Sequence, residues 1–203
     1  MNDTDRRLGD GWREHAAGRL GAAEAVYREV LAHAPATANA WCLLGMSLHD
    51  QGRFDESKVA YRRALAIDPH FSVAWSNLSN TLTRAGEPEQ AISCCETALA
   101  NSPDYAPALH NLGTAQVAAG RFAEARASFE HALELVPDNA DSATNLALVR
   151  LTLGDYAGGW PAYERRWDKA GVKRPPVAAN LWDGSPLRGR SFLLHHEQGL
   201  AAW

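Results

Sequence analysis

The chain has 203 residues, enough for one or two domains with a buried core. Hydrophobic residues make up 46% and charged residues 22%, and glycine and proline are too few for a collagen-like or disordered chain. No apolar run approaches the ~18 residues of a membrane-spanning helix. Charges also lie where a secretory signal needs its apolar centre. We therefore expect a soluble, cytoplasmic protein with no membrane partner.

The net charge of −4 is unevenly distributed along the chain. Residues 1–149 carry 12 Lys or Arg against 19 Asp or Glu, whereas residues 150–190 carry 8 against 4. An acidic body followed by a basic junction predicts two segments with different roles.

Five series of residues recur at an interval of 34 positions. Their members are Gly18, Gly52, Gly86, Gly120 and Gly154; Pro35, Pro69, Pro103 and Pro137; Tyr27, Tyr61, Cys95, Phe129 and Tyr163; Val30, Ala64, Ala98 and Ala132; and Leu44, Leu78, Leu112 and Leu146. A fixed period of this length is typical of repeat folds, in which each unit buries its apolar face against the next. We expect repeats at 4–37, 38–71, 72–105 and 106–139 and a degenerate fifth at 140–173.

Each repeat is expected to form two amphipathic helices in chain order. Apolar residues follow the three-to-four-residue spacing of a helix face, as Ala125, Phe129 and Ala132 do. The glycine of each repeat breaks the first helix, and the proline blocks continuation of the second. Gly45 and Gly113 lie inside first helices, where glycine is unfavourable, and we expect them to allow a neighbouring helix to approach closely.

These motifs resemble the tetratricopeptide repeat family. Trp41-Cys42-Leu43-Leu44-Gly45 and Leu109-His110-Asn111-Leu112-Gly113 match its first-helix motif, and Ala91 and Ala125 match its small second-helix residue. The first repeat departs from the pattern, as a terminal repeat can. The resemblance implies an all-α, right-handed solenoid of five helix pairs, in which the first helix of each pair lines a concave groove.

An asparagine recurs at one groove position in three successive repeats, as Asn77, Asn111 and Asn145. A primary amide has two donors and one acceptor, which suit an extended peptide backbone. The series resembles the asparagine ladder of O-linked N-acetylglucosamine transferases. A structural role, in hydrogen bonds between neighbouring helices, is the alternative.

The residues beside this ladder are mixed and mostly uncharged. Candidate peptide-binding residues besides the three asparagines are Asn80, Arg84, His110, Thr114 and Thr144. Repeats that capture the carboxyl-terminal tails of chaperones need several Lys or Arg to hold two carboxylates. Because Arg84 is nearly the sole basic residue among the candidate groove positions, the sequence favours an extended, neutral peptide as the ligand.

No pattern in the sequence indicates a catalytic residue, a metal site or a cofactor. Cys42, Cys94 and Cys95 lack the spacing of a zinc site or a redox pair, and His195-His196-Glu197 has no second ligand cluster near it. The basic junction interleaves charge with Trp160 and Trp167, as single-strand nucleic-acid surfaces do. A capping helix explains this pattern more simply, so we expect no nucleic-acid partner.

Residues 174–203 are expected to form a linker and the start of an α/β domain, with one unpaired strand at 191–196. Gly159-Trp160, Leu181-Trp182-Asp183-Gly184 and Glu197-Gln198-Gly199-Leu200 resemble the junction between tetratricopeptide repeats and a heptosyltransferase-type glycosyltransferase domain in bacterial proteins. Two functions therefore remain open. The chain is either a peptide-binding scaffold or the substrate-recruiting part of a protein glycosyltransferase whose catalytic domain lies elsewhere.

Overall fold

The computed structural model describes residues 3–164, and these residues form ten α-helices and no strand. The helices are α1 (Asp3–Ala16), α2 (Leu20–His33), α3 (Ala38–Asp50), α4 (Phe54–Ile67), α5 (Ser72–Arg84), α6 (Pro88–Asn101), α7 (Ala106–Ala118), α8 (Phe122–Leu135), α9 (Ala140–Thr152) and α10 (Tyr156–Glu164). The expected all-helical fold is thus confirmed for this part of the chain. The expected strand at 191–196 and the linker before it lie outside the described residues.

A glycine ends the first helix of every pair. The five glycines of the 34-residue series have φ between 74° and 84°, a left-handed conformation that residues with a Cβ rarely adopt. The amide of each of these glycines also donates to a carbonyl in the last turn of the preceding helix, as Gly52 does to His49. The turn between the paired helices is therefore encoded locally, one glycine per repeat.

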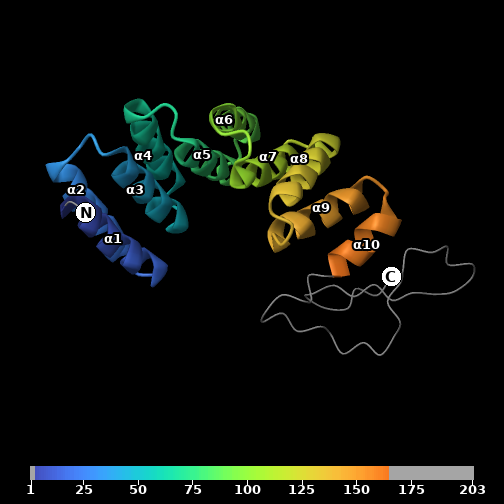
Figure 1. The fold of residues 1–203 in the computed structure, drawn as a ribbon, viewed down its shortest axis with the longest axis horizontal. Helices are drawn as coiled ribbons and strands as arrows, with labels where there is room; N and C mark the ends of the chain where they lie inside the picture. Colours follow the sequence, from blue (N-terminus) through green and yellow to red (C-terminus); the bar gives the residue numbers. More distant parts are fainter. Residues whose placement is uncertain (1–2, 165–203) are drawn as a thin grey trace, which may run out of the picture.

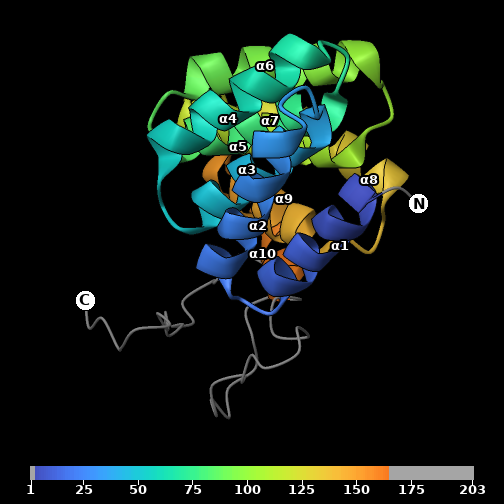
Figure 2. The same ribbon diagram turned by 90° about the vertical axis from the view of Figure 1, so that its left-hand side faces the viewer.

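The helix pairs follow one another along an arch, with α1 and α2 at one end and α9 and α10 at the other (Figure 1). Figure 2 looks along the row from its amino-terminal end, so that α9 and α10 lie behind α1 and α2. Among the described residues, the backbones of consecutive odd-numbered helices approach one another closely, whereas those of no two even-numbered helices do. The odd-numbered helices therefore lie on the inner side of the curve. We call the solvent-facing side of α1, α3, α5, α7 and α9 the inner surface.

An aromatic ring packed over a glycine holds each of three helix pairs together. A Cβ added to Gly45 would lie 2.8 Å from the ring of Tyr61, and one added to Gly113 would lie 2.7 Å from Phe129. Both distances are shorter than van der Waals contact, so the predicted close approach is confirmed. In the third repeat the glycine position is Ser79 and the ring position is Cys95, and both residues are fully buried. In this repeat, Ser79 is larger than the glycine of the other repeats, and its partner Cys95 is smaller than their aromatic ring.

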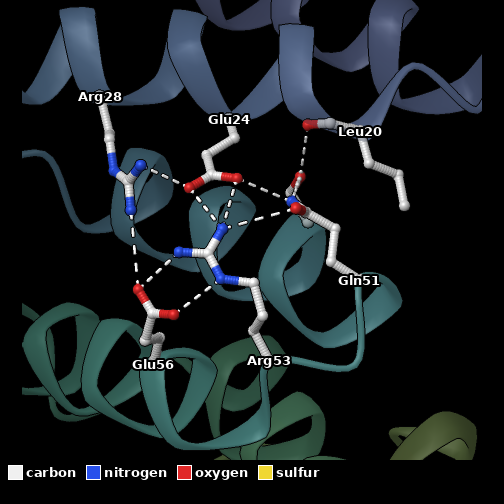
Figure 3. A network of polar contacts seen from close by, with 7 residues as sticks. Leu20, Glu24, Arg28, Gln51, Arg53 and Glu56 are labelled. Carbon is white, nitrogen blue, oxygen red and sulfur yellow. Dashed lines mark hydrogen bonds and ion pairs between the residues drawn. The ribbon is translucent and has the colours of Figure 1, made fainter.

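An ion pair between a buried glutamate and a partly exposed arginine links the first two repeats. Glu24 of α2 is 6% exposed and accepts two 2.8 Å hydrogen bonds from Arg53, the residue before α4, together with one from Gln51 (Figure 3). Arg28 also pairs with Glu24, and Arg53 pairs with Glu56. Burial opposes ionisation of Glu24, but the hydrogen bonds from Gln51 and Arg53 leave its pKa below the ordinary value.

The equivalent pair in the next repeat has the opposite polarity. Lys58 occupies the position of Glu24, Glu87 occupies that of Arg53, and their charged atoms lie 2.7 Å apart. If the repeats stacked in another order, so that Glu24 faced Glu87 instead of Arg53, two carboxylates would lie close together, which is unfavourable. The two pairs therefore favour the order in which the first three repeats stack.

Candidate peptide-binding surface

The eight residues predicted to bind a peptide lie on three consecutive inner helices. Asn77, Asn80 and Arg84 belong to α5, His110, Asn111 and Thr114 to α7, and Thr144 and Asn145 to α9. Asn80 and Arg84 are exposed, and the other six are partly buried. The 34-residue period brings these side chains to neighbouring helices because α5 contacts α7 and α7 contacts α9.

Two of the three ladder asparagines bond to the preceding repeat. The Nδ2 of Asn111 donates to the backbone carbonyl and to the hydroxyl of Ser76, both at 3.0 Å. A carbonyl oxygen can only accept, so this bond fixes the orientation of the amide. Asn77 makes the equivalent contact with the sulfur of Cys42 at 3.9 Å. The asparagine ladder thus connects neighbouring repeats.

This orientation determines what Asn111 can offer a ligand. Its Nδ2 is directed at Ser76, and its Oδ1 has no hydrogen-bond partner among the described residues. The remaining group is an acceptor, which suits the N–H of a peptide backbone. The side chain of Asn145 makes no hydrogen bond within residues 3–164, so it is not tied to its neighbours in this way.

Three of the other predicted residues are engaged within the repeats. The hydroxyls of Thr114 and Thr144 donate to carbonyls one turn earlier in their own helices, those of His110 and Ala140. The ring of His110 bonds to Ser142 at 2.8 Å and lies 5.7 Å from the ring of Phe129. Burial lowers the pKa of His110, which favours the neutral imidazole.

A second set of contacts, near the ends of the inner helices, crosses the first three repeats. His15 of α1 is buried and bonds through Nε2 to Asp50 of α3 at 2.8 Å. His49 of α3 bonds to Thr81 of α5 at 2.9 Å, and burial lowers its pKa. His15 was missed as an inter-repeat contact. The repeat period could have predicted this contact, because His15 lies 34 positions before His49 and therefore occupies the same position in its repeat.

The inner surface also carries exposed apolar residues. Trp12 is 46% and Leu148 is 43% exposed, and both lie at the repeat position of Asn80. At this repeat position, polar residues of the third and fourth repeats thus lie between apolar residues of the other repeats. Within residues 3–164 no cluster of His, Cys, Asp or Glu could hold a metal ion, and no helix is long and apolar enough to cross a bilayer.

An arch of stacked helix pairs with side chains repeated along its inner helices defines an α-solenoid of the kind that mediates protein interactions. Tetratricopeptide repeat models match residues 38–71, 71–138 and 110–175. Together these matches cover more than half of the chain, and the chain belongs to the tetratricopeptide repeat family. Among curated proteins, no relative matches it.

Solved structures share the fold. A thermophilic tetratricopeptide repeat protein of Thermus thermophilus is 24% identical, with a TM-score of 0.71 over 82% of this chain and 91% of that one. PilF of Pseudomonas aeruginosa is 21% identical, with a TM-score of 0.75 over 84% of this chain and 78% of that one. The first repeat domain of Spaghetti (RPAP3), solved with the HSP90 peptide SRMEEVD, is 27% identical. Its TM-score is 0.56 over 58% of this chain and 93% of that one.

Proposed function

We propose that the chain is a protein–protein interaction scaffold that binds an extended peptide segment along its inner surface. The observation that carries this proposal is the fixed amide of Asn111, whose free acceptor suits a peptide N–H. The exposed amide of Asn80 and the unbonded amide of Asn145 extend the same chemistry to neighbouring helices. Peptide binding by the similar Spaghetti (RPAP3) domain supports the proposal.

The proposed ligand is a protein segment rather than a nucleic acid or a membrane. Residues 1–149 carry more acidic than basic side chains, which disfavours the phosphate backbone. Most of the candidate side chains are neutral and bond to backbone groups as readily as to side chains. We therefore propose that an extended backbone supplies most of the contacts.

The alternative is a substrate-recruiting role beside a glycosyltransferase domain. It rests on the resemblance of the junction motifs, of which Gly159-Trp160 and Tyr163-Glu164 lie within the described residues. None of the three matching family models describes a glycosyltransferase. The two functions share the same peptide-binding surface, so the scaffold proposal does not depend on the choice between them.

Asn145→Ala tests the binding role of the ladder with little effect on the fold. Because Asn145 makes no hydrogen bond within residues 3–164, the variant should unfold at the wild-type urea concentration. A peptide selected on the wild-type chain should bind about threefold to tenfold more weakly, the value of one lost hydrogen bond. Fluorescence anisotropy with a labelled peptide measures this change.

Thr97→Ala is the matched control, because Thr97 lies on the outer helix α6 and its hydroxyl bonds only to its own helix. It should leave the affinity unchanged. Equal affinities for wild type and Asn145→Ala, with the peptide bound to the inner helices, would remove Asn145 from the binding surface. A peptide bound to the outer helices would overturn the proposed function itself.

A further inference from the structure

Arg84 differs from every other basic residue of the inner helices. Arg6, Arg7 and Arg13 of α1 pair with carboxylates, and Arg150 of α9 pairs with Glu130 at 3.0 Å. Arg84 is exposed in the last turn of α5, and within residues 3–164 no carboxylate lies at ion-pair distance from it. Its guanidinium therefore presents five donors and a positive charge to the solvent.

We propose that the inner surface selects peptides carrying an acidic side chain, which forms an ion pair with Arg84 when the peptide is bound. The proposal rests on the scaffold function above and adds the chemistry of the partner. It refines the expectation of a neutral ligand to a peptide that is neutral along most of its length and negatively charged at one position.

The charged groups around Arg84 leave its charge uncompensated. His49, on the adjacent helix α3, has a lowered pKa because it is buried; the charge of Asp50 raises this pKa and the weaker effect of Arg84 lowers it. Its imidazole is bonded to Thr81. Asp50, the acidic residue next to His49, bonds to the Nε2–H of His15 and lies beyond ion-pair distance of Arg84. An incoming carboxylate therefore meets a guanidinium that makes no ion pair with any of the described residues.

The spacing on α5 limits where the acidic residue lies in the peptide. Asn111 bonds to Ser76, which is eight residues before Arg84 on the same helix. Eight residues of α-helix rise about 12 Å. An extended peptide covers that distance in about four residues. For a peptide that runs parallel to α5, we expect Asp or Glu at least about four positions from the peptide residue whose N–H bonds to Asn111, because Asn111 itself lies on α7.

A side-chain carboxylate fits this site better than a carboxyl terminus. Capture of a peptide terminus uses several cationic side chains around two carboxylates. Among the described inner helices, Arg84 is the one cation without a carboxylate partner. One guanidinium matches one carboxylate in a bidentate pair.

The test begins with selection of peptides from a displayed library of random twelve-residue sequences on the immobilised full chain. Selected peptides should be enriched in Asp or Glu at one position. In anisotropy titrations, Arg84→Glu should weaken binding of an acidic peptide at least about tenfold. Replacing the peptide's acidic residue with Lys should restore much of the affinity for Arg84→Glu. Amidation of the peptide's carboxyl terminus should have no effect.

Arg63→Glu provides the control, because Arg63 is an exposed arginine of the outer helix α4 with no ion pair in the described structure. It should leave the affinity unchanged. Peptides that bind the inner helices without acidic enrichment, or that bind Arg84→Glu as tightly as wild type, would overturn the inference and leave the scaffold function standing. Loss of binding on amidation would assign Arg84 to a terminal carboxylate and would also overturn it. Retention of no peptide at all would overturn both proposals.

Discussion

Phe129→Ala is expected to lower the free energy of unfolding by about 3 to 5 kcal/mol, the range for a fully buried aromatic residue. The ring has no exposed surface and lies over Gly113, where even a methyl group has no room. It belongs to a core cluster with Ala125 and Leu146, so its loss leaves a cavity between α7, α8 and α9. Urea denaturation measures the change, and the transition midpoint should fall while its slope stays close to wild type.

Cys95→Ala is the matched control at the same repeat position. Cys95 is equally buried, but its thiol is much smaller than a phenyl ring, and the variant should lose far less stability. Burial raises the pKa of Cys95 to about 12, so this side chain is a neutral thiol at physiological pH. A loss for Phe129→Ala below about 1 kcal/mol, the level of an ordinary substitution, would contradict the ring-over-glycine packing.

Glu24→Lys is expected to destabilise the chain by about 1.5 to 3 kcal/mol, the usual value of a hydrogen bond to a charged group, because Glu24 is buried while its partner Arg53 is 35% exposed. The new ammonium would lie among Arg28 and Arg53, in a site that leaves Glu24 only 6% exposed. Adding Arg53→Glu should recover part of this loss, because the double variant copies the polarity of the natural Lys58–Glu87 pair. A double-mutant cycle in urea measures the coupling between the two positions.

Glu134→Lys gives the comparison for a simple change of charge. Glu134 is an exposed residue of α8 with no ion pair among the described residues, and its replacement should change stability by less than about 0.5 kcal/mol. Additive losses in the Glu24→Lys and Arg53→Glu double variant would show that the pair does not act as a unit. The stacking order would then depend on apolar packing alone.

The sequence was sufficient to predict the repeating helices and their turns. Both depend on local chemistry that recurs every 34 residues, such as the positive φ at Gly52 and the aromatic ring over Gly45. The positions of the eight candidate residues on inner helices followed from the same period. Their availability to a ligand did not, because it depends on contacts between repeats.

Asn111 and Glu24 illustrate this limit. The series of asparagines did not reveal that the Nδ2 of Asn111 bonds to Ser76, since that depends on how closely α5 and α7 pack. The ion pair of Glu24 and Arg53 was also missed, although its reversed copy at Lys58 and Glu87 recurs with the same spacing of 29 residues. Opposite charges at a fixed separation in successive repeats were the signal that could have found it.

Nuclear magnetic resonance of the full chain, titrated with a library-selected peptide, tests most directly whether the inner helices bind the ligand. Backbone and side-chain amide shifts should change along α5, α7 and α9, with the side-chain amide signals of Asn80 and Asn145 among the most affected. Residues of the outer helices α4, α6 and α8 should change little. Shift changes confined to those outer helices would contradict the account.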